Sequence, residues 1–186
     1  MAVPTRFQQC LFAAVLAAAS GACAAHAPRA CVSADDVRAS LAIATVEDDI
    51  LVFRPTPPVA GSDLQPIELV RHRSDAGCRP EPVDRYEPEG GPPHLHEIFV
   101  HPVQGAPNLF AIVSWPIWHA GEGIRGTRYA VYAYRVDGDH WARNDVIVKH
   151  PALYGGIVGT VHGAPSTFEG TTRDGVVAML HRLGLD

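Results

Sequence analysis

Long apolar runs separated by short turn sequences dominate the second half of the chain. The runs are rich in aromatic and β-branched residues, which is typical of β-strands. Because only short Gly-, Asn- or Asp-containing links join them, the pattern predicts strands that pair as an antiparallel meander. The predicted strands are LHEIFVHPV (95–103), LFAIVSW (109–115), TRYAVYAYRV (127–136) and HWARNDVIV (140–148).

The run 109–115 differs from its neighbours because both of its alternating sets of residues are apolar. A strand of this kind is covered on both faces, so we predict that it is central in the sheet and that Trp115 points into the core. Further along, Asp137-Gly138 is a dipeptide that tight hairpin turns prefer, because both residues tolerate positive φ. We therefore predict a hairpin at this position.

The first half of the chain contains two shorter strand patterns, at 49–55 and 66–73, and two proline-rich segments. Proline lacks a backbone N–H and has a fixed φ, so we predict that the segments 55–63 and 79–93 are loops. Ser33 precedes two aspartates and an apolar stretch, a pattern that predicts a short helix capped by this serine.

The end of the chain has the pattern of an amphipathic helix. The stretch from Thr171 to Asp174 approximates a capping box, and Gly184 stands where a helix C-terminal cap is expected. We expect the fold class to be α+β: mainly an antiparallel β-meander sheet, with a C-terminal α-helix packed on it and a short N-terminal helix. The apolar positions at helical spacing are Val176, Val177, Leu180 and Leu183.

The N-terminus has the three-part layout of a secretory signal: Arg6, an apolar run and then small residues. Cleavage after Ala24 predicts a signal peptide over 1–24 and a single exported β-rich domain over 25–186, most simply periplasmic, with the proline-rich loop inside it. An alternative is lipid attachment at Cys23, because the preceding residues partly resemble a lipobox.

Cys31 and Cys78 are the only cysteines of the predicted mature chain. In an oxidising compartment an isolated pair usually forms a disulfide, so we predict that these two residues are joined. The alternative is a pair of buried free thiols.

The chain has 15 basic and 20 acidic residues, a formal net charge of −5. Nucleic acids and anionic membrane surfaces attract clustered positive charge, so the balance argues against both as partners. The glycines of the segment 154–163 lack the order that cradles phosphate, and no other cofactor motif is present, so we expect no cofactor. Beyond the signal no further membrane span is expected, and no feature indicates an oligomeric state.

The sequence HLHEIFVH places three histidines and a glutamate within eight residues. His96 and His101 are five apart, which places them on different sides of a helix and on opposite faces of a strand. His94 and His96 are two positions apart, so a strand places both on one face, as in some zinc sites. The alternative of a metal-dependent hydrolase needs a third ligand, for which His119, His140 and Glu122 are candidates.

The segment SWPIWHAGEGIRG (114–126) combines aromatic, charged and glycine residues at the end of a predicted buried strand. We predict a flexible loop that touches a ligand or partner. Ser114 lies inside a strand and no nucleophile elbow is present, so the sequence does not indicate nucleophilic catalysis. The predicted partner-binding residues are Trp118, His119, Glu122 and Arg125.

The second half of the chain resembles small exported bacterial proteins with FG-GAP-like sheet segments. The resemblance rests on three segments in this order: EIFVHPVQGAPNLFAIVSW, GTRYAVYAYRVDG and FEGTTRDGVVAMLHRLG. The Asp-rich calcium turns of FG-GAP repeats are absent, with VQGAPN in their place. Some proteins of this kind are similar to periplasmic immunity proteins, which implies a non-enzymatic binding or inhibitor protein whose partner is a secreted antibacterial effector. The alternatives are the metal-dependent hydrolase and a structural envelope protein.

Overall fold

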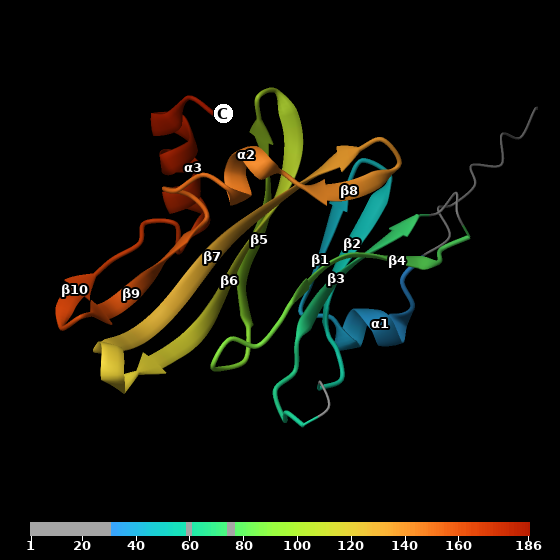
Figure 1. Cartoon of the computed structure of the whole chain (residues 1–186). Helices are drawn as coiled ribbons and strands as arrows, with labels where there is room; N and C mark the ends of the chain where they lie inside the picture. Colours follow the sequence, from blue (N-terminus) through green and yellow to red (C-terminus); the bar gives the residue numbers. More distant parts are fainter. Residues whose placement is uncertain (1–30, 59–60, 74–76) are drawn as a thin grey trace, which may run out of the picture.

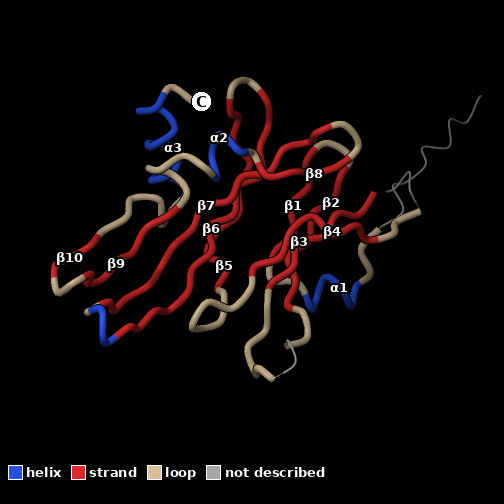
Figure 2. The backbone as a smooth tube through the Cα atoms, viewed as in Figure 1, coloured by secondary structure: helices blue, strands red, loops and turns tan. Residues whose placement is uncertain are grey.

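The computed structural model describes residues 31–58, 61–73 and 77–186, which form two antiparallel sheets and a few short helices (Figures 1 and 2). The α+β class is therefore confirmed, although the strands form two sheets where one was expected. The predicted signal peptide and Cys23 lie outside the described residues. Within the described ranges no helix is long and apolar enough to cross a membrane.

The first sheet has four strands in the order β1-β2-β3-β4. The strands predicted at 49–55 and 66–73 are confirmed as β2 and β3. The prediction of a loop over 79–93 is wrong in its first part, which forms the edge strand β4. An edge strand needs ladder donors on one side only, so Pro80 and Pro82, at alternate positions, are tolerated. The bounds are β1 Ala42–Val46, β2 Asp49–Pro55, β3 Ile67–Arg73 and β4 Pro80–Tyr86.

The second sheet has six strands in the order β10-β9-β7-β6-β5, with β8 paired to β7. The predicted meander is confirmed, and so is the tight turn at Asp137-Gly138, which joins β7 to β8. The strands β6 and β7 each have 14 residues and are longer than predicted. The bounds are β5 His94–Val103, β6 Ala106–His119, β7 Ile124–Asp137, β8 His140–Arg143, β9 Gly155–Val161 and β10 Ala164–Ser166.

Within the described residues, three α-helices lie outside the sheets. α1 (Ala34–Ala39) begins at Ser33, whose capping box with Asp36 confirms the predicted start. α2 (Asp145–Val148) replaces the second half of a predicted strand, because the Asn144 side chain accepts a hydrogen bond from Val146 N–H and caps a helix there. α3 (Arg173–Leu183) is the predicted C-terminal helix; its cap is Thr172, and Gly184 ends it in the left-handed region.

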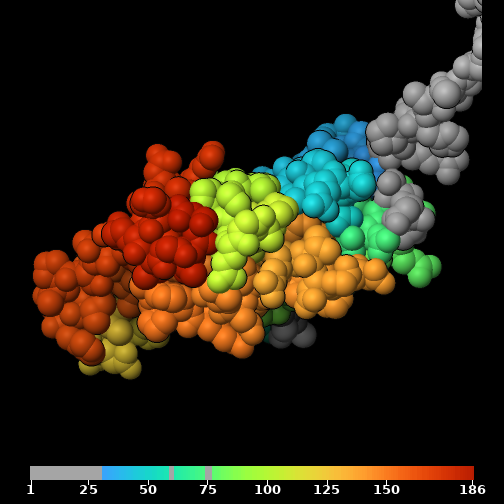
Figure 3. Space-filling view, turned by 90° about the horizontal axis from the view of Figure 1, so that it is seen from above, coloured from blue at the N-terminus to red at the C-terminus, as the bar shows by residue number. Residues whose placement is uncertain are grey.

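The six-stranded sheet is covered on both faces, as predicted for the run 109–115. One alternating set of β6 packs against the four-stranded sheet, with Trp115 at 1% exposure in this core. The other set, with Phe110 at its centre, packs against apolar residues of α2 and α3. The layers are therefore the small sheet, the large sheet, and α2 with α3. Figure 3 shows the β5–β6 segment (yellow-green) between α3 and the β1–β2 hairpin.

The disulfide between Cys31 and Cys78 is present and confirms the predicted pairing. It joins the segment before α1 to the segment before β4, across 47 positions of sequence. The link therefore connects the N-terminal end of the described chain to the edge of the four-stranded sheet.

A buried polar cluster joins the two sheets at β4. The Tyr134 hydroxyl donates to Asp84 Oδ2 over 2.5 Å, and the Tyr86 and Tyr134 hydroxyls lie 2.6 Å apart. Arg143 donates from Nε and Nη2 to the same carboxylate over 2.6 and 2.7 Å. Burial raises the pKa of Tyr86 and of Tyr134 well above the usual tyrosine value, so both hydroxyls stay protonated and hydrogen-bonded.

Candidate functional site

The segment 114–126 is the end of a long β-hairpin, and the prediction of a flexible loop is wrong. β6 continues to His119 and β7 begins at Ile124, which leaves only the 3₁₀ turn η1 (Ala120–Glu122) and Gly123 between them. Gly123 has a φ of 62°, a left-handed conformation that glycine adopts without strain. The two strands pair through to their ends, so this aromatic segment is held by ladder hydrogen bonds.

Trp118 has the most exposed large apolar side chain of the described ranges, with 78% of its surface accessible. It is the direct cross-strand partner of Arg125 in β7, so the indole and the guanidinium share one face of the hairpin. Trp115 is three positions earlier, points to the other face and is buried, as predicted. The hairpin therefore presents one aromatic and one cationic side chain side by side in solvent.

The face that carries Trp118 continues inward along both strands. Residues two apart in a strand share a face, and so do direct cross-strand partners. This face of the sheet is the one that α3 covers further along β6. The cross-strand pairs on it, from the tip inward, are Trp118–Arg125, Pro116–Thr127 and Ser114–Tyr129.

His96 is the extra residue of a β-bulge in β5. The register with β6 has Cα partners for Leu95 and for Glu97 but skips the residue between them. Its ring Nε2 lies 2.7 Å from Ser114 Oγ, so the imidazole reaches the face described above. His94 is the direct partner of Ser114 and is on the same face, as the alternation predicted.

The bulge changes the position of His101 relative to His96. His101 pairs with Asn108, six residues from Ser114 in β6, so both histidines are on one face, and the predicted opposite placement is wrong. Six strand residues separate their partners by about 20 Å. The three histidines still do not converge, because distance along the strand keeps them apart.

A hollow of about 350 Å³ lies on this face beside the hairpin. Its floor holds the Ser114–His96 hydrogen bond, and the His96 ring centroid lies 5.1 Å from that of Tyr129. We call this hollow, together with Trp118 and Arg125 at its outer end, the hairpin groove. The residues that line the hollow are His94, Leu95, His96, Ser114, Pro116, Thr127 and Tyr129.

The other two predicted partner-binding residues have different positions. His119 is adjacent to Trp118 in β6 and therefore points to the opposite face. Glu122 lies in η1, where its carbonyl oxygen is 2.9 Å from His162 Nδ1. Gly163 N–H also donates to the carbonyl of Gly123, so the β9–β10 turn braces the hairpin tip. The structure thus brings Trp118 and Arg125 together and leaves His119 and Glu122 outside the groove.

Within the described part of the chain, no group of three His, Cys, Asp or Glu side chains is placed to hold a metal ion. The predicted third ligands are distant from His94 and His96. His119 and Glu122 lie at the hairpin tip, and His140 begins β8 beyond the opposite end of β7. The pair His94 and His96 therefore has no third protein ligand among these residues.

The lining of the hollow offers hydrogen-bond donors and contains no carboxylate. Its accessible polar side chains are two histidines and the hydroxyls of Thr127 and Tyr129, because Ser114 is buried against His96, and Arg125 follows Thr127 on the same face. Hydroxyl and imidazole groups donate to an anion, and a guanidinium adds a charge-assisted, bidentate donor. The groove is therefore suited to an acidic group attached to an apolar or aromatic surface.

The pair Ser114–His96 also has the geometry of a nucleophile beside a base. Two features count against catalysis: Ser114 is only 2% exposed, and no other described side chain hydrogen-bonds the second ring nitrogen of His96. A catalytic histidine is normally oriented by such a group. We therefore interpret the hydrogen bond as part of the groove floor.

Sequence reasoning missed Thr127 and Tyr129 and treated Ser114 as an ordinary strand residue. Their grouping with His96 depends on the pairing of β5, β6 and β7 and on a bulge that no turn residue marks. The only signal in the sequence was the alternation of polar residues along TRYAVYAYRV, which places Thr127 and Tyr129 on one face.

No family model, no curated protein and no solved structure matches this chain. The resemblance to exported FG-GAP-like proteins therefore stays a prediction. The candidate site has been assembled from the geometry of the chain alone.

Proposed function

We propose that the protein is a non-enzymatic, exported binding protein that recognises a protein partner through the hairpin groove. The observation that carries the proposal is Trp118, which is 78% exposed beside Arg125 on a fully paired hairpin. An indole in solvent contributes nothing to the core, whereas Trp and Arg are the residues that most often dominate binding at protein interfaces. The Cys31–Cys78 disulfide is compatible with export.

The rigidity of the hairpin supports the proposal. Strands of 14 residues hold the tip, and the β9–β10 turn braces it, so the backbone that carries Trp118 and Arg125 needs little ordering on binding. Pre-organised anchors lose less conformational entropy when a complex forms, which favours affinity.

The lining indicates the chemistry of the partner. A donor-rich hollow without a carboxylate, next to an arginine and an indole, fits an Asp or Glu side chain flanked by apolar residues. The resemblance of the C-terminal half to exported proteins, some of them similar to immunity proteins, suggests that this partner is a secreted antibacterial effector. The interaction would then block the effector in the periplasm.

The test compares the wild-type protein with Trp118→Ala, Arg125→Glu and the control Tyr154→Ala. Tyr154 is an exposed aromatic residue, 52% accessible, outside the hollow. Proteins of the periplasmic and secreted fractions are captured on each variant and identified, and each purified candidate is then titrated. We expect one partner that binds wild type and Tyr154→Ala equally, and Trp118→Ala at least about 30-fold more weakly, as for an interface anchor.

Two results would overturn the proposal. The first is that no partner is captured, or that the captured partner binds wild type and Trp118→Ala equally. The other is turnover of ester or amide substrates by the wild type that Ser114→Ala abolishes, because that outcome would make the Ser114–His96 pair catalytic. Retention of zinc at one equivalent, lost in His96→Ala, would instead favour the metal-dependent hydrolase.

A further inference from the structure

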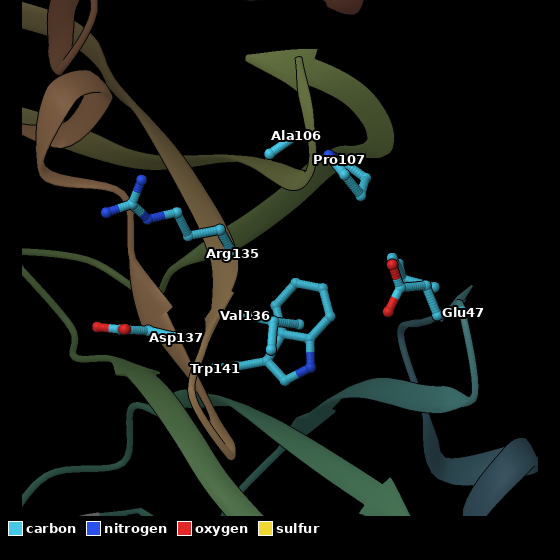
Figure 4. Close-up of a pocket in the computed structure, with 8 residues that line it drawn as sticks. Glu47, Ala106, Pro107, Arg135, Val136, Asp137 and Trp141 are labelled. Carbon is cyan, nitrogen blue, oxygen red and sulfur yellow. The ribbon is translucent and has the colours of Figure 1, made fainter. Parts of the chain in front are cut away.

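A second cavity lies at the opposite end of β7, where three hairpins meet (Figure 4). Its volume is about 210 Å³, and for comparison a cavity of about 150 Å³ is enough for benzene. About eleven strand residues, roughly 35 Å, separate it from Arg125 of the hairpin groove. We call it the turn cavity; its lining is Val46, Glu47, Ala106, Pro107, Arg135, Val136, Asp137 and Trp141.

The indole of Trp141 is a fixed wall of this cavity. Its Nε1 donates to Asp49 Oδ2 over 2.7 Å, and that carboxylate is also paired with Arg71 Nη2 over 2.7 Å. The only polar atom of the ring is thus satisfied on the side of the four-stranded sheet, and the side chain is 5% exposed. The ring therefore offers only its π-surface and carbon edge to the cavity.

Of the three charged lining residues, only Glu47, which is exposed, is directed toward the indole, and it lies beside the ring. Figure 4 shows its carboxylate facing Trp141, whereas Arg135 and Asp137 extend away. The register agrees: Val136 is the direct partner of Trp141, so its two neighbours in β7 point to the other face. The cavity thus combines one aromatic ring, one carboxylate and apolar walls.

The Glu47 carboxylate has no hydrogen-bond or ion-pair partner among the described residues. The residue also has a φ of 54°, which is uncommon outside glycine, in the turn that joins β1 to β2. The neighbouring Asp48 adds negative charge to this turn, while the nearest buried acid, Asp49, is neutralised by Arg71. The carboxylates of Glu47, Asp48 and Asp137 outnumber the single cation Arg135 around the cavity, so the local charge is negative.

We propose that the turn cavity binds a primary alkylammonium group with a short apolar stem. The ammonium would pair with the Glu47 carboxylate and lie against the Trp141 ring as a cation–π contact, while the stem packs on Val46, Pro107 and Val136. A neutral ligand of the same shape lacks both electrostatic contacts. The same chemistry is offered by a free small amine and by a lysine side chain of another protein.

The test follows the indole N–H signals of the full chain, labelled with ¹⁵N at tryptophan, by NMR. The chain has three tryptophans, and Trp118→Phe removes one signal to aid assignment. The probes are n-butylammonium chloride, n-butanol as the neutral match, and lysine capped at both backbone ends; sodium chloride keeps the ionic strength constant. The capped lysine distinguishes a side-chain ligand from a free amine, because only a site open enough for backbone accepts it.

We expect the Trp141 signal to shift and saturate with n-butylammonium, with at least tenfold weaker binding of n-butanol. Glu47→Gln should weaken the amine at least fivefold, whereas the matched control Asp48→Asn, one residue away, should change the affinity less than twofold. Glu47→Asn is a second variant, because asparagine tolerates positive φ. Equal binding of amine and alcohol, or unchanged affinity in both Glu47 variants, would overturn the proposal.

Discussion

The carboxylate of Asp84 is one of the polar contacts that join the two sheets, so neutralising it should destabilise the fold. Its side chain is 11% exposed and accepts from the Tyr134 hydroxyl and twice from Arg143. The substitution Asp84→Asn keeps the shape and one acceptor oxygen but removes the charge that these donors face. The edge strand β4, which carries Asp84, would then be held by its ladder with β3 and by the buried Tyr86 side chain.

The magnitude follows from the exposure of each partner. A buried hydrogen bond to a charged group contributes about 1.5–3 kcal/mol, which applies to the Tyr134 hydroxyl. The Arg143 side chain is 47% exposed, so solvent screening limits its ion pair to about 1 kcal/mol. Because asparagine retains an acceptor, we expect a net loss of about 2–3 kcal/mol in the free energy of unfolding.

The assay is urea denaturation of the oxidised protein at pH 7, followed by tryptophan fluorescence. The matched control is Asp63→Asn, which makes the same change of charge at an exposed position. The expected loss also corresponds to a melting temperature lower by roughly 5–10 °C, while the control stays within about 1 °C. If Asp84→Asn and Asp63→Asn unfold at the same urea concentration, the reasoning that places the inter-sheet link at Asp84 is refuted.

Three further predictions follow from other parts of the structure. The raised pKa of Tyr86 and of Tyr134 keeps both protonated in the fold, so stability is complete below the unfolded tyrosine pKa near 10 and falls above it, by up to about 1.4 kcal/mol per pH unit for each residue. Alkaline urea titrations check this, and Tyr86→Phe should reduce the slope. Replacing both cysteines of the Cys31–Cys78 disulfide by serine should cost roughly 4 kcal/mol in the chain-entropy picture, measured by thermal melting without reductant. Trp118→Ala should leave the melting temperature within about 2 °C of the wild type, because the side chain has little burial to lose.

Most strands were predictable because periodicity and turn chemistry are local. The run 109–115 is apolar at every position except Ser114, and it is buried on both faces as β6. Asp137-Gly138 forms the predicted turn, and Ser33 and Gly184 cap the predicted helices. In each case the turn or cap residue lies within a few positions of the turn or helix that it determines.

Apart from α2, which a local cap at Asn144 starts, the errors share a physical origin, because each depends on a partner distant in sequence. Pro80 and Pro82 form a strand because β3 offers them an edge, which no local pattern shows. His101 lies on the same face as His96 because the bulge at His96 shifts the alternation of the rest of β5. The glycines of 114–126 suggested a loop, yet the chain there has a partner in β9, whose backbone comes within 2.2 Å of a Cβ placed on Gly126.

Some polar and aromatic side chains of the two sheets are paired within the fold, and others have no partner among the described residues. Asp84 and Asp49 are neutralised by Arg143 and Arg71, and both pairs also hydrogen-bond an aromatic residue of the large sheet. These pairs fix the register of one sheet on the other, which apolar contacts alone specify weakly. Trp118 and Glu47 have no such role, although one is a costly aromatic in solvent and the other a residue at positive φ. They lie near opposite ends of β7, so the partner proposed for the hairpin groove and the amine proposed for the turn cavity would occupy separate sites.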